Sequence, residues 1–315
     1  MKEGKVIKST GSWYMVRSEN KIWDCRIKGR IRLDGIKSTN PVAVGDVVDF
    51  HPEEGQESRG VIAGIHDRKN YIVRKSVNLS KRTHVIAANL DQAILIATLE
   101  FPKTYPRFID RFMVTAEAYD IPGVLIFNKH DLYTEEMLAE LDFLSMVYRD
   151  AGYTVVHTSL VSGTGLDEFR NLLKDRTSLL SGHSGVGKSS LINHVEPGLD
   201  LKTKKISESH LQGQHTTTFA EMHALSFGGD IIDTPGIRGF GLVDMDKEEI
   251  GDYFPEIFRL KAGCRFHNCL HVEEPGCAVK EAVENARLPL SRYESYVALV
   301  QGLDEDDTYR ADIYE

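Results

Sequence analysis

Residues 182–189 constrain this chain more than any other stretch, because they read Gly-His-Ser-Gly-Val-Gly-Lys-Ser and follow a short apolar run at 177–180. The segment fits the pattern G-x-x-x-x-G-K-[ST]. In that pattern glycines let successive backbone N–H groups surround an anionic phosphate chain at the start of a helix. The segment therefore predicts a strand, a phosphate-binding loop and a helix, with a flexible glycine and serine loop as the alternative.

Two side chains of this loop have distinct expected roles. Lys188 is expected to reach the β- and γ-phosphates of a nucleoside triphosphate, and the Ser189 hydroxyl to ligate Mg²⁺. The other positions are expected to contribute mainly backbone N–H donors. The predicted phosphate-binding residues are Gly182, His183, Ser184, Gly185, Val186, Gly187, Lys188, Ser189 and Ser190.

Length and cysteine usage bound the class of protein. A chain of 315 residues is long enough for two or three domains. No apolar run approaches the roughly 18 residues of a membrane span, and the N-terminus leads into no apolar signal core. Three of the four cysteines lie between 264 and 277 beside histidines, which favours a metal site in a reducing compartment. We therefore expect a cytoplasmic protein with no membrane partner.

Charge is unevenly distributed along the chain, although the net charge is only −9. Residues 1–82 hold 17 Lys and Arg against 10 Asp and Glu, a balance of +7, and the remaining residues hold 21 against 37, a balance of −16. A basic front module on an acidic body is expected if one face meets the phosphate backbone of a nucleic acid. An ordinary solvated basic surface is the alternative.

Short alternating apolar runs, punctuated by glycines, fill the chain between about residues 5 and 65. They predict five or six strands and hence a small closed β-barrel. Barrels with a basic face and nearby aromatic residues often bind RNA, although Trp13 and Trp23 suit the barrel core equally well. Four basic residues alternate along one predicted strand and would share a face. These are Arg26, Lys28, Arg30 and Arg32.

After a basic junction the pattern changes to short buried strands that alternate with helices. This alternation is typical of a parallel sheet covered on both faces, with ligands at the carboxyl ends of the strands. The predicted strands lie at 93–97, 124–127 and 153–156. The predicted helices lie at 108–116 and 138–147, the second ending at Gly152.

The four residues 128–131, Asn-Lys-His-Asp, follow one of these buried strands and match the guanine-reading element of GTPases. Guanine presents two adjacent donors that the carboxylate of Asp131 can accept as a fork, whereas adenine offers no such pair. A polar loop capped by Asp131 is the alternative. Ser159 follows the next strand, where GTPases carry a serine, although Leu160 departs from the usual alanine. The predicted guanine-binding residues are Asn128, Lys129, His130, Asp131 and Ser159.

Two further segments suit the switch regions of a nucleotide-binding protein. Residues 213–218 read Gly-Gln-His-Thr-Thr-Thr, and a threonine there could close on Mg²⁺ when the γ-phosphate is present. We favour Thr217, with Thr216 and Thr218 as alternatives. Residues 233–236 read Asp-Thr-Pro-Gly after an apolar strand. The predicted switch and Mg²⁺ residues are Ser189, Thr217, Asp233 and Gly236.

The order of these elements is unusual, because the guanine element precedes the phosphate loop. In ordinary GTPases the phosphate loop comes first. The order therefore predicts a circularly permuted GTPase domain, in which the second switch after Gly236 runs directly into the C-terminal part of the chain.

A cysteine-rich segment follows at 264–277. Three thiolates and one imidazole would complete a tetrahedral Zn²⁺ shell with no open position, which makes one structural zinc per chain the prediction. His267 is an alternative histidine ligand, and free cysteines are the alternative interpretation. Helices flank the segment, including one for which Ser291 and Glu294 predict a capping box. The predicted zinc ligands are Cys264, Cys269, His271 and Cys277.

These predictions describe a multidomain α/β protein with three units. They are a small all-β barrel, a circularly permuted P-loop GTPase domain and a mainly helical zinc-binding domain. The predicted divisions are 1–66 for the barrel, 67–88 for the basic junction, 89–242 for the GTPase domain and 243–315 for the zinc-binding domain.

The permuted order, the basic barrel and the spacing Cys-x4-Cys-x-His-x5-Cys together resemble the RsgA family of small ribosomal subunit biogenesis GTPases, also called YjeQ or YloQ. Further familiar stretches lie at 44–48, 184–193, 213–218 and 292–294. The resemblance implies GTP hydrolysis stimulated by the small ribosomal subunit during its late maturation. It also implies an OB-fold that contacts ribosomal RNA, binding of GTP and GDP with Mg²⁺, and, as we expect, a monomer.

The resemblance bears on catalysis as well. Many GTPases orient the attacking water with a glutamine directly after Asp-x-x-Gly, but Ile237 occupies that position here. By resemblance His215 is the catalytic substitute, with an exposed loop histidine as the alternative. Two other function classes stay open: a GTP-gated RNA scaffold with incidental hydrolysis, and a P-loop kinase or ATPase, against which the guanine element argues.

Overall fold

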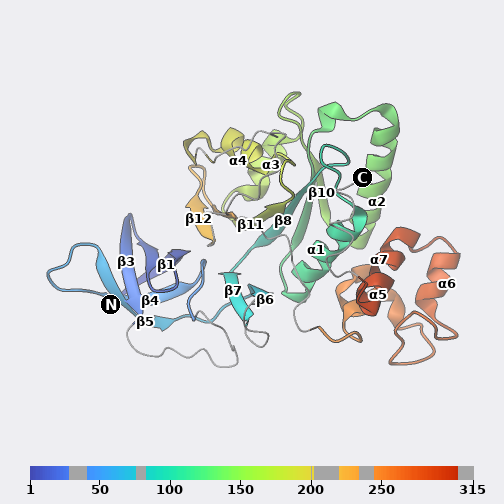
Figure 1. Cartoon of the computed structure of the whole chain (residues 1–315), viewed down its shortest axis with the longest axis horizontal. Coiled ribbons are helices and arrows are strands. Elements are labelled where there is room, and N and C mark those ends of the chain that lie inside the picture. The colour runs from blue at the N-terminus through green and yellow to red at the C-terminus, as the bar shows by residue number, and fades with distance from the viewer. Residues whose placement is uncertain (28–40, 76–82, 200, 202–219, 234–244, 304–315) are drawn as a thin grey trace, which may run out of the picture.

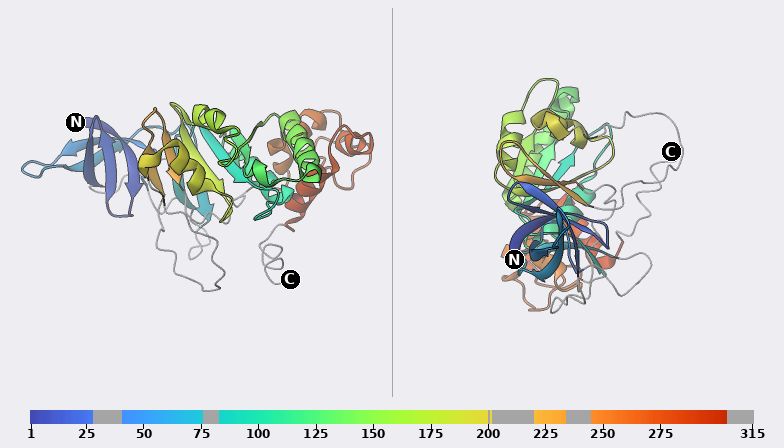
Figure 2. Two further views of the ribbon diagram at one scale, coloured as in Figure 1. Left: turned by 90° about the horizontal axis from the view of Figure 1, so that it is seen from above. Right: turned by 90° about the vertical axis from the view of Figure 1, so that its left-hand side faces the viewer.

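A computed structural model of the chain describes residues 1–27, 41–75, 83–199, 201, 220–233 and 245–303. Three units lie in a row, with a β-barrel at one end, a helix-covered sheet in the middle and a helical unit at the other end (Figures 1 and 2). Three of the four alternating basic residues, Lys28, Arg30 and Arg32, lie outside the described residues.

Five strands form the described part of the barrel, in the order β1-β2-β3-β5-β4, with β4 pairing back onto β1. Neighbours are antiparallel except β3 and β5. This closed five-stranded arrangement is the predicted OB-fold barrel. Trp23 lies in its core, whereas Trp13 keeps 40% of its surface exposed. The strands are β1 (Lys2–Ser9), β2 (Tyr14–Ser18), β3 (Lys21–Ile27), β4 (Val47–Pro52) and β5 (Arg59–Ile65).

The basic junction contains a two-stranded antiparallel sheet, formed by β6 (Tyr71–Lys75) and β7 (Thr83–Ala88). The apolar run at 42–44 is divided between the two units, because Val42 lies in the barrel core whereas Val44 makes an isolated parallel bridge to Ala87 of β7. The sequence pattern had placed this run among the barrel strands. Burial of Val44 and Ala87 against the main core accounts for the difference.

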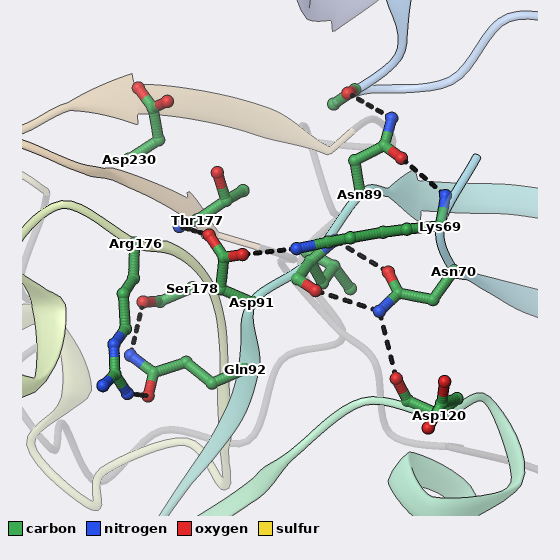
Figure 3. A network of polar contacts seen from close by, with 12 residues as sticks. Lys69, Asn70, Asn89, Asp91, Gln92, Asp120, Arg176, Thr177, Ser178 and Asp230 are labelled. Carbon is green, nitrogen blue, oxygen red and sulfur yellow. Dashed lines mark hydrogen bonds and ion pairs between the residues drawn. The ribbon is translucent and has the colours of Figure 1, made fainter. Parts of the chain in front are cut away.

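Side-chain amides fasten this junction to the central sheet (Figure 3). Asn70 donates to the carbonyl oxygens of Leu90 at 2.9 Å and Asp120 at 3.1 Å. Asn89 accepts from the Lys69 amide at 3.0 Å and donates to the Gly45 carbonyl at 3.0 Å. Because these bonds join barrel, junction and sheet, the junction is an ordered connection at the amino ends of the central strands.

The central sheet contains five parallel strands in the order β10-β9-β8-β11-β13, with β12 antiparallel at the edge. Its apolar residues are buried on both faces, as the sequence pattern predicted. The strands are β8 (Gln92–Ala97), β9 (Gly123–Phe127), β10 (Thr154–His157), β11 (Thr177–Gly182), β12 (Glu221–Ala224) and β13 (Asp230–Asp233).

Helices cover both faces of this sheet (Figure 1). One core is formed with α1 (Pro106–Ala118) and α2 (Glu135–Ala151), and the opposite core with α3 (Leu166–Leu173) and α4 (Lys188–Val195). The predicted helix stop at Gly152 is confirmed, since this residue caps α2 with a φ of 114°. Short 3-10 turns lie at η1 (His130–Leu132), η2 (Pro197–Leu199) and η3 (Ile250–Tyr253).

The barrel joins the central sheet through β1 and β12, whose pairing makes one continuous sheet of eleven strands. Lys8 forms an ion pair with Glu221 at 3.0 Å, and Asp230 accepts from Lys5 at 3.1 Å and Arg17 at 2.6 Å. These three barrel cations are therefore paired with carboxylates of the central sheet. Part of the basic excess of the front module thus stabilises the interface between the two units.

The C-terminal unit contains α5 (Pro255–Lys261), α6 (Ala278–Glu284) and α7 (Leu290–Gln301). It docks on α1, whose Asp110 forms a buried ion pair with Arg292 of α7 at 2.5 Å. Losing one member of such a buried pair costs about 3–5 kcal/mol. The predicted capping box at Ser291 is wrong, because α7 begins at Leu290 and its N-cap is Pro289, which has no side-chain cap bond.

Among the described residues no helix is long and apolar enough to cross a membrane.

Candidate functional site

The carboxyl ends of the parallel strands share one edge of the central sheet. Strand register sets Ala97 beside Phe127 and Phe127 beside His157, while Ile96 lies beside Gly182. Leu180 lies beside Asp233 on the other side of β11. Asp233 at the end of β13 and the segments that follow β9, β10 and β11, which the sequence assigned to Mg²⁺, guanine and phosphate, therefore lie at a single edge.

The predicted phosphate loop begins at the end of β11 and leads into α4, which starts at Lys188. Gly187 caps that helix with a φ of 93°, and a Cβ there would lie 2.4 Å from the Asn128 Nδ2. A Cβ at Gly182 would lie 2.5 Å from the Ile96 carbonyl oxygen. Only glycine fits these two close approaches. Val186 is fully buried below the loop.

The segment at 128–131 packs directly on this phosphate loop. The Asn128 amide donates to the Val186 carbonyl at 2.8 Å, and the Lys129 ammonium donates to the Gly185 carbonyl at 2.7 Å. Burial lowers the pKa of Lys129, and nearby Asp131 opposes that shift. Two stretches 56 to 58 residues apart in sequence are thus joined by direct hydrogen bonds.

A second set of bonds orients the polar groups around Asp131. The Ser159 hydroxyl donates to the Asp131 Oδ1, and the Ser159 Oγ also accepts from the amides of Val161 at 3.2 Å and Ser162 at 3.1 Å. Thr158 donates to the Asn128 Oδ1 at 2.9 Å. Ser159 is fully buried while Asp131 is exposed, so the serine fixes a carboxylate that stays accessible from outside.

His130, the remaining member of this segment, turns toward β10. Its ring stacks on His157 with centroids 5.9 Å apart and planes at 21°. His157 Nε2 lies 2.7 Å from the Ser145 Oγ on α2, and burial, followed by the charge of Arg149, lowers the pKa of His157. The imidazole of His130 therefore belongs to the support of the loop.

The predicted Mg²⁺ residues are only partly described. Lys188 forms an ion pair with the Asp233 Oδ1, which joins the start of α4 to the end of β13. Ser189 and Ser190 are half-buried in the first turn of α4, and Ser184 is exposed on the loop. The remaining predicted residues, His215, Thr216, Thr217, Thr218, Gly236 and Ile237, lie outside the described residues.

Three residues support this edge without belonging to any motif. Tyr133 donates to the Asn128 carbonyl at 2.6 Å and accepts from the Leu99 amide at 3.0 Å. Phe101 offers its carbonyl oxygen to the Lys129 ammonium. Phe108 of α1 packs against the ring of His183, with centroids 4.0 Å apart. Sequence reasoning missed them because tertiary position alone, and no spacing signal, gives them these contacts.

A second candidate site lies in the C-terminal unit, where three thiols and one imidazole face one another. Ligand atoms of Cys264, Cys269, His271 and Cys277 all lie within 4.8 Å of one another. The His271 Nδ1 is 3.4 Å from the sulfurs of both Cys264 and Cys277. The alternative ligand, His267, is exposed and outside the group.

The dimensions of this group suit a metal ion. Metal–sulfur bonds of about 2.3 Å in a tetrahedron put two sulfurs about 3.8 Å apart, and the sulfurs of Cys264 and Cys277 are 3.9 Å apart. Burial raises the pKa of Cys269 to about 12, so a cation would be needed to hold that thiol as a thiolate. The Cys3His group can therefore hold a metal ion.

Helix α7 holds this group in place. The Tyr293 hydroxyl donates to the His271 carbonyl at 2.7 Å, and the Tyr296 hydroxyl donates to the Leu270 carbonyl at 2.7 Å. The Glu274 carboxylate accepts from the amides of Leu270 at 2.9 Å and Val272 at 3.1 Å. These bonds orient the backbone around the one histidine of the group.

Comparison with known proteins gives full-length matches. The profile described as RsgA GTPase matches residues 65–243, and the RsgA N-terminal domain profile matches residues 3–62. A protein of Christiangramia forsetii called small ribosomal subunit biogenesis GTPase RsgA is 59% identical over 99% of both chains. A protein of the same name from Flavobacterium psychrophilum is 57% identical over 99% of this chain and 95% of its own.

Solved structures agree with these matches. The crystal structure of YjeQ from Thermotoga maritima superposes with a TM-score of 0.79 at 36% identity, covering 97% of this chain and 99% of that one. The crystal structure of YloQ, described as a circularly permuted GTPase, superposes with a TM-score of 0.75 at 32% identity, covering 97% and 96%. With its guanine segment ahead of its phosphate loop and both matched along nearly the whole chain, this protein belongs to the RsgA family of GTPases.

Proposed function

We propose that this chain is a GTPase of small ribosomal subunit biogenesis, which binds the subunit and hydrolyses GTP to GDP and phosphate at a rate that the subunit stimulates. The observation that carries the proposal is its 59% identity over 99% of the chain to a relative of that name. The packing of residues 128–131 on the phosphate loop supports it, because a guanine-reading carboxylate and a phosphate cradle must share one ligand.

In this proposal the nucleotide is held at the edge of the central sheet. Asp131 accepts the guanine N1–H and amino group, with Ser159 orienting it and Asn128, Lys129 and His130 shaping the base site. Residues 182–190 surround the phosphates, and the N-terminal end of α4 adds its dipole. Lys188 is drawn to the β- and γ-phosphates, and Mg²⁺ is ligated by Ser189 and Thr217, with Asp233 near its shell and Gly236 contacting the γ-phosphate.

Hydrolysis needs an oriented water and charge stabilisation at the γ-phosphate. Ile237 has no group that can orient water, so a slow basal rate is expected. We assign the catalytic role to His215, which adjoins the switch threonines in sequence. A rate that depends on a partner follows if the partner places this side chain against the attacking water.

The metal in the Cys3His group is proposed to be zinc. Thiolate and imidazole ligands in a tetrahedral group favour Zn²⁺, and four protein ligands leave no position for a reacting water. A structural zinc would therefore fix the C-terminal unit. We propose the divisions 1–66 for the barrel, 67–88 for the junction, 89–242 for the GTPase domain and 243–315 for the zinc-binding domain.

The barrel is proposed to contact ribosomal RNA. Although Lys5, Lys8 and Arg17 form ion pairs at the interface with the central sheet, other basic and aromatic groups are exposed on the described surface of the barrel. The Arg59 guanidinium lies 5.6 Å from the centre of the exposed Trp13 ring. Such a pair can stack on an unpaired base. We propose that the chain acts as a monomer in the cytoplasm, where ribosomal subunits mature.

GTP turnover by the full-length protein, measured with purified small subunits, with large subunits and with neither, tests this function. We expect stimulation by small subunits alone. Equal rates in all three reactions would contradict the proposed enzyme role and favour a GTP-gated scaffold, and stimulation by large subunits would contradict the proposed partner.

A further inference from the structure

Helix α1 and the loop before it contact the proposed nucleotide site, at the carboxyl edge of the central sheet, at three points. The Lys129 ammonium donates both to the Phe101 carbonyl in this loop and to the Gly185 carbonyl in the phosphate loop. Pro102 is the nearest neighbour of a Cβ placed on Gly185, at 3.4 Å. The Phe108 ring of α1 packs on the His183 ring. The position of α1 therefore helps to set the position of the phosphate loop.

The other side of α1 belongs to the C-terminal unit. Val114 lies in the same buried core as residues of α5, α6 and α7. Asp110 is fully buried and accepts from the Arg292 Nη1 at 2.5 Å, while the Tyr148 hydroxyl donates to it at 2.8 Å. Figure 1 shows α1 between the central sheet and the C-terminal helices. The helix is thus shared by the two units.

Arg292 also contacts another helix of the C-terminal unit. Its Nε donates to Glu256 of α5 at 2.6 Å, which ties α5 and α7 to α1. The following residue, Tyr293, donates to the carbonyl of His271, a member of the metal group. A chain of contacts therefore joins the phosphate loop to the metal group, in which the helix backbone of α1 links Phe108 to Asp110 and that of α7 links Arg292 to Tyr293. Its members are His183, Phe108, Asp110, Arg292, Tyr293 and His271.

We propose that Arg292 is a positioning residue for the nucleotide site, and that it couples the metal-holding C-terminal unit to the phosphate loop through α1. Coupling between two sites is reciprocal, so nucleotide bound at the phosphate loop stabilises the contacts of α7, and firm docking of α7 favours nucleotide binding. This inference goes beyond the proposed function, because it requires only guanine nucleotide binding and no ribosomal partner.

A second route between the same two units is the chain itself, since residues 234–244 connect β13 to the C-terminal unit. The two routes make different demands. Coupling through the connecting segment needs neither Phe108 nor Arg292, whereas coupling through α1 needs both. Variants of these two residues therefore discriminate between the routes.

Amide hydrogen exchange of the full-length protein, with and without saturating GDP, tests the proposal. We expect GDP to slow exchange in α4 and also in α7 and residues 270–272, by about 5-fold or more for a coupling of typical strength. In Phe108→Ala, whose side chain is only half-buried, α4 should keep its protection while α7 loses its own. Arg292→Lys, which keeps a positive charge for Asp110, should lose most of the α7 response.

Arg259→Ala is the matched control, because Arg259 donates to the Asp150 carbonyl at 3.1 Å and so ties the same unit to α2 instead of α1. It should behave as the unaltered protein. Absence of any GDP effect on α7 in the unaltered protein would overturn the proposal. A GDP effect on α7 that persists in either Phe108→Ala or Arg292→Lys would also overturn it, and persistence in both would assign the coupling to the connecting segment.

Discussion

The buried hydroxyl of Ser159 donates to the exposed carboxylate of Asp131, across 28 residues of sequence. Because that serine oxygen also accepts two backbone amides, it cannot turn away from the loop. A carboxylate held in this way is already oriented before a base binds, which lowers the entropic cost of binding. We therefore expect selection of the guanine base to depend on two residues, because Asp131 would bind the base and Ser159 holds Asp131 in position.

Asp131→Asn should weaken guanine nucleotide binding and relax the preference over adenine nucleotides. The amide replaces one acceptor oxygen with a donor that faces a guanine donor. The loss of hydrogen bonds to a charged group should raise the dissociation constant of GDP by about 10- to 150-fold. Competition titrations with GDP and ADP measure it. Asp142→Asn, an exposed change on α2, is the control, and an unaltered guanine preference in Asp131→Asn would refute the assignment.

Ser159→Ala should also weaken GDP binding, but less, by about 10-fold, because the carboxylate remains and only its orientation is lost. The variant also leaves the amides of Val161 and Ser162 without their shared acceptor. Ser162→Ala is a matched control, since its hydroxyl contacts only the exposed Thr164 hydroxyl at 2.8 Å. Equal affinities of the two variants, measured by calorimetry, would show that Ser159 does not position Asp131.

If the Cys3His group holds the proposed zinc, Cys269→Ala should lower the zinc content from one per chain to well below one, and should reduce the thermal stability of the C-terminal unit. Three remaining ligands leave the ion exposed to water, and structural zinc contributes directly to folding. Cys25→Ala is the control, because Cys25 is buried in the barrel core far from the other cysteines in sequence. Metal content by elemental analysis decides, and an unchanged zinc content in Cys269→Ala would exclude this residue as a ligand.

His215→Ala should abolish hydrolysis stimulated by small subunits while leaving GTP affinity nearly unchanged. The expectation follows from the absence of a water-orienting side chain at Ile237 and from the position of His215 beside the switch threonines. Single-turnover hydrolysis with and without subunits measures it. Normal stimulated turnover in the variant would remove His215 from the mechanism.

Trp13→Ala should weaken binding to single-stranded segments of small-subunit RNA by about 5- to 150-fold, which corresponds to the loss of about 1–3 kcal/mol of base stacking. Ile22→Ala on β3 is the control, because Ile22 is similarly exposed, at 48% against 40%, but has no aromatic ring. Fluorescence anisotropy with short RNA fragments gives both affinities. Equal losses in the two variants would argue that Trp13 contributes apolar surface and no stacking.

The sequence predicted the parts of this fold that depend on local backbone geometry. A helix after the phosphate loop and a helix stop at Gly152 were both predicted and are confirmed, because glycines in the loop and at the cap adopt conformations that few residues adopt. Apolar runs at 93–97 and 124–127 predicted buried parallel strands because such strands have no polar face. These signals act within a few residues, so they can be read without knowing the rest of the molecule.

Contacts between distant segments could not be read in the same way. Tyr133 bridges Asn128 and Leu99, and Phe108 packs on His183, but nothing in the spacing of these residues distinguishes them from ordinary core aromatics. The basic excess of the front module was interpreted as a nucleic-acid face. In the structure three of those cations form ion pairs with Glu221 and Asp230 of the central sheet. The sequence could not predict these pairs, because they depend on which edge of the sheet the barrel contacts.

The pairing of β1 with β12 also prevents two copies of the protein from associating through the edge of the central sheet. A sheet that ended at β12 would offer free amide and carbonyl groups to the same edge of another copy, which is a common start of aggregation. The barrel lies on that edge and is itself closed by the pairing of β4 with β1. A chain shortened to its central and C-terminal units would therefore expose the edge of β12 and self-associate more readily.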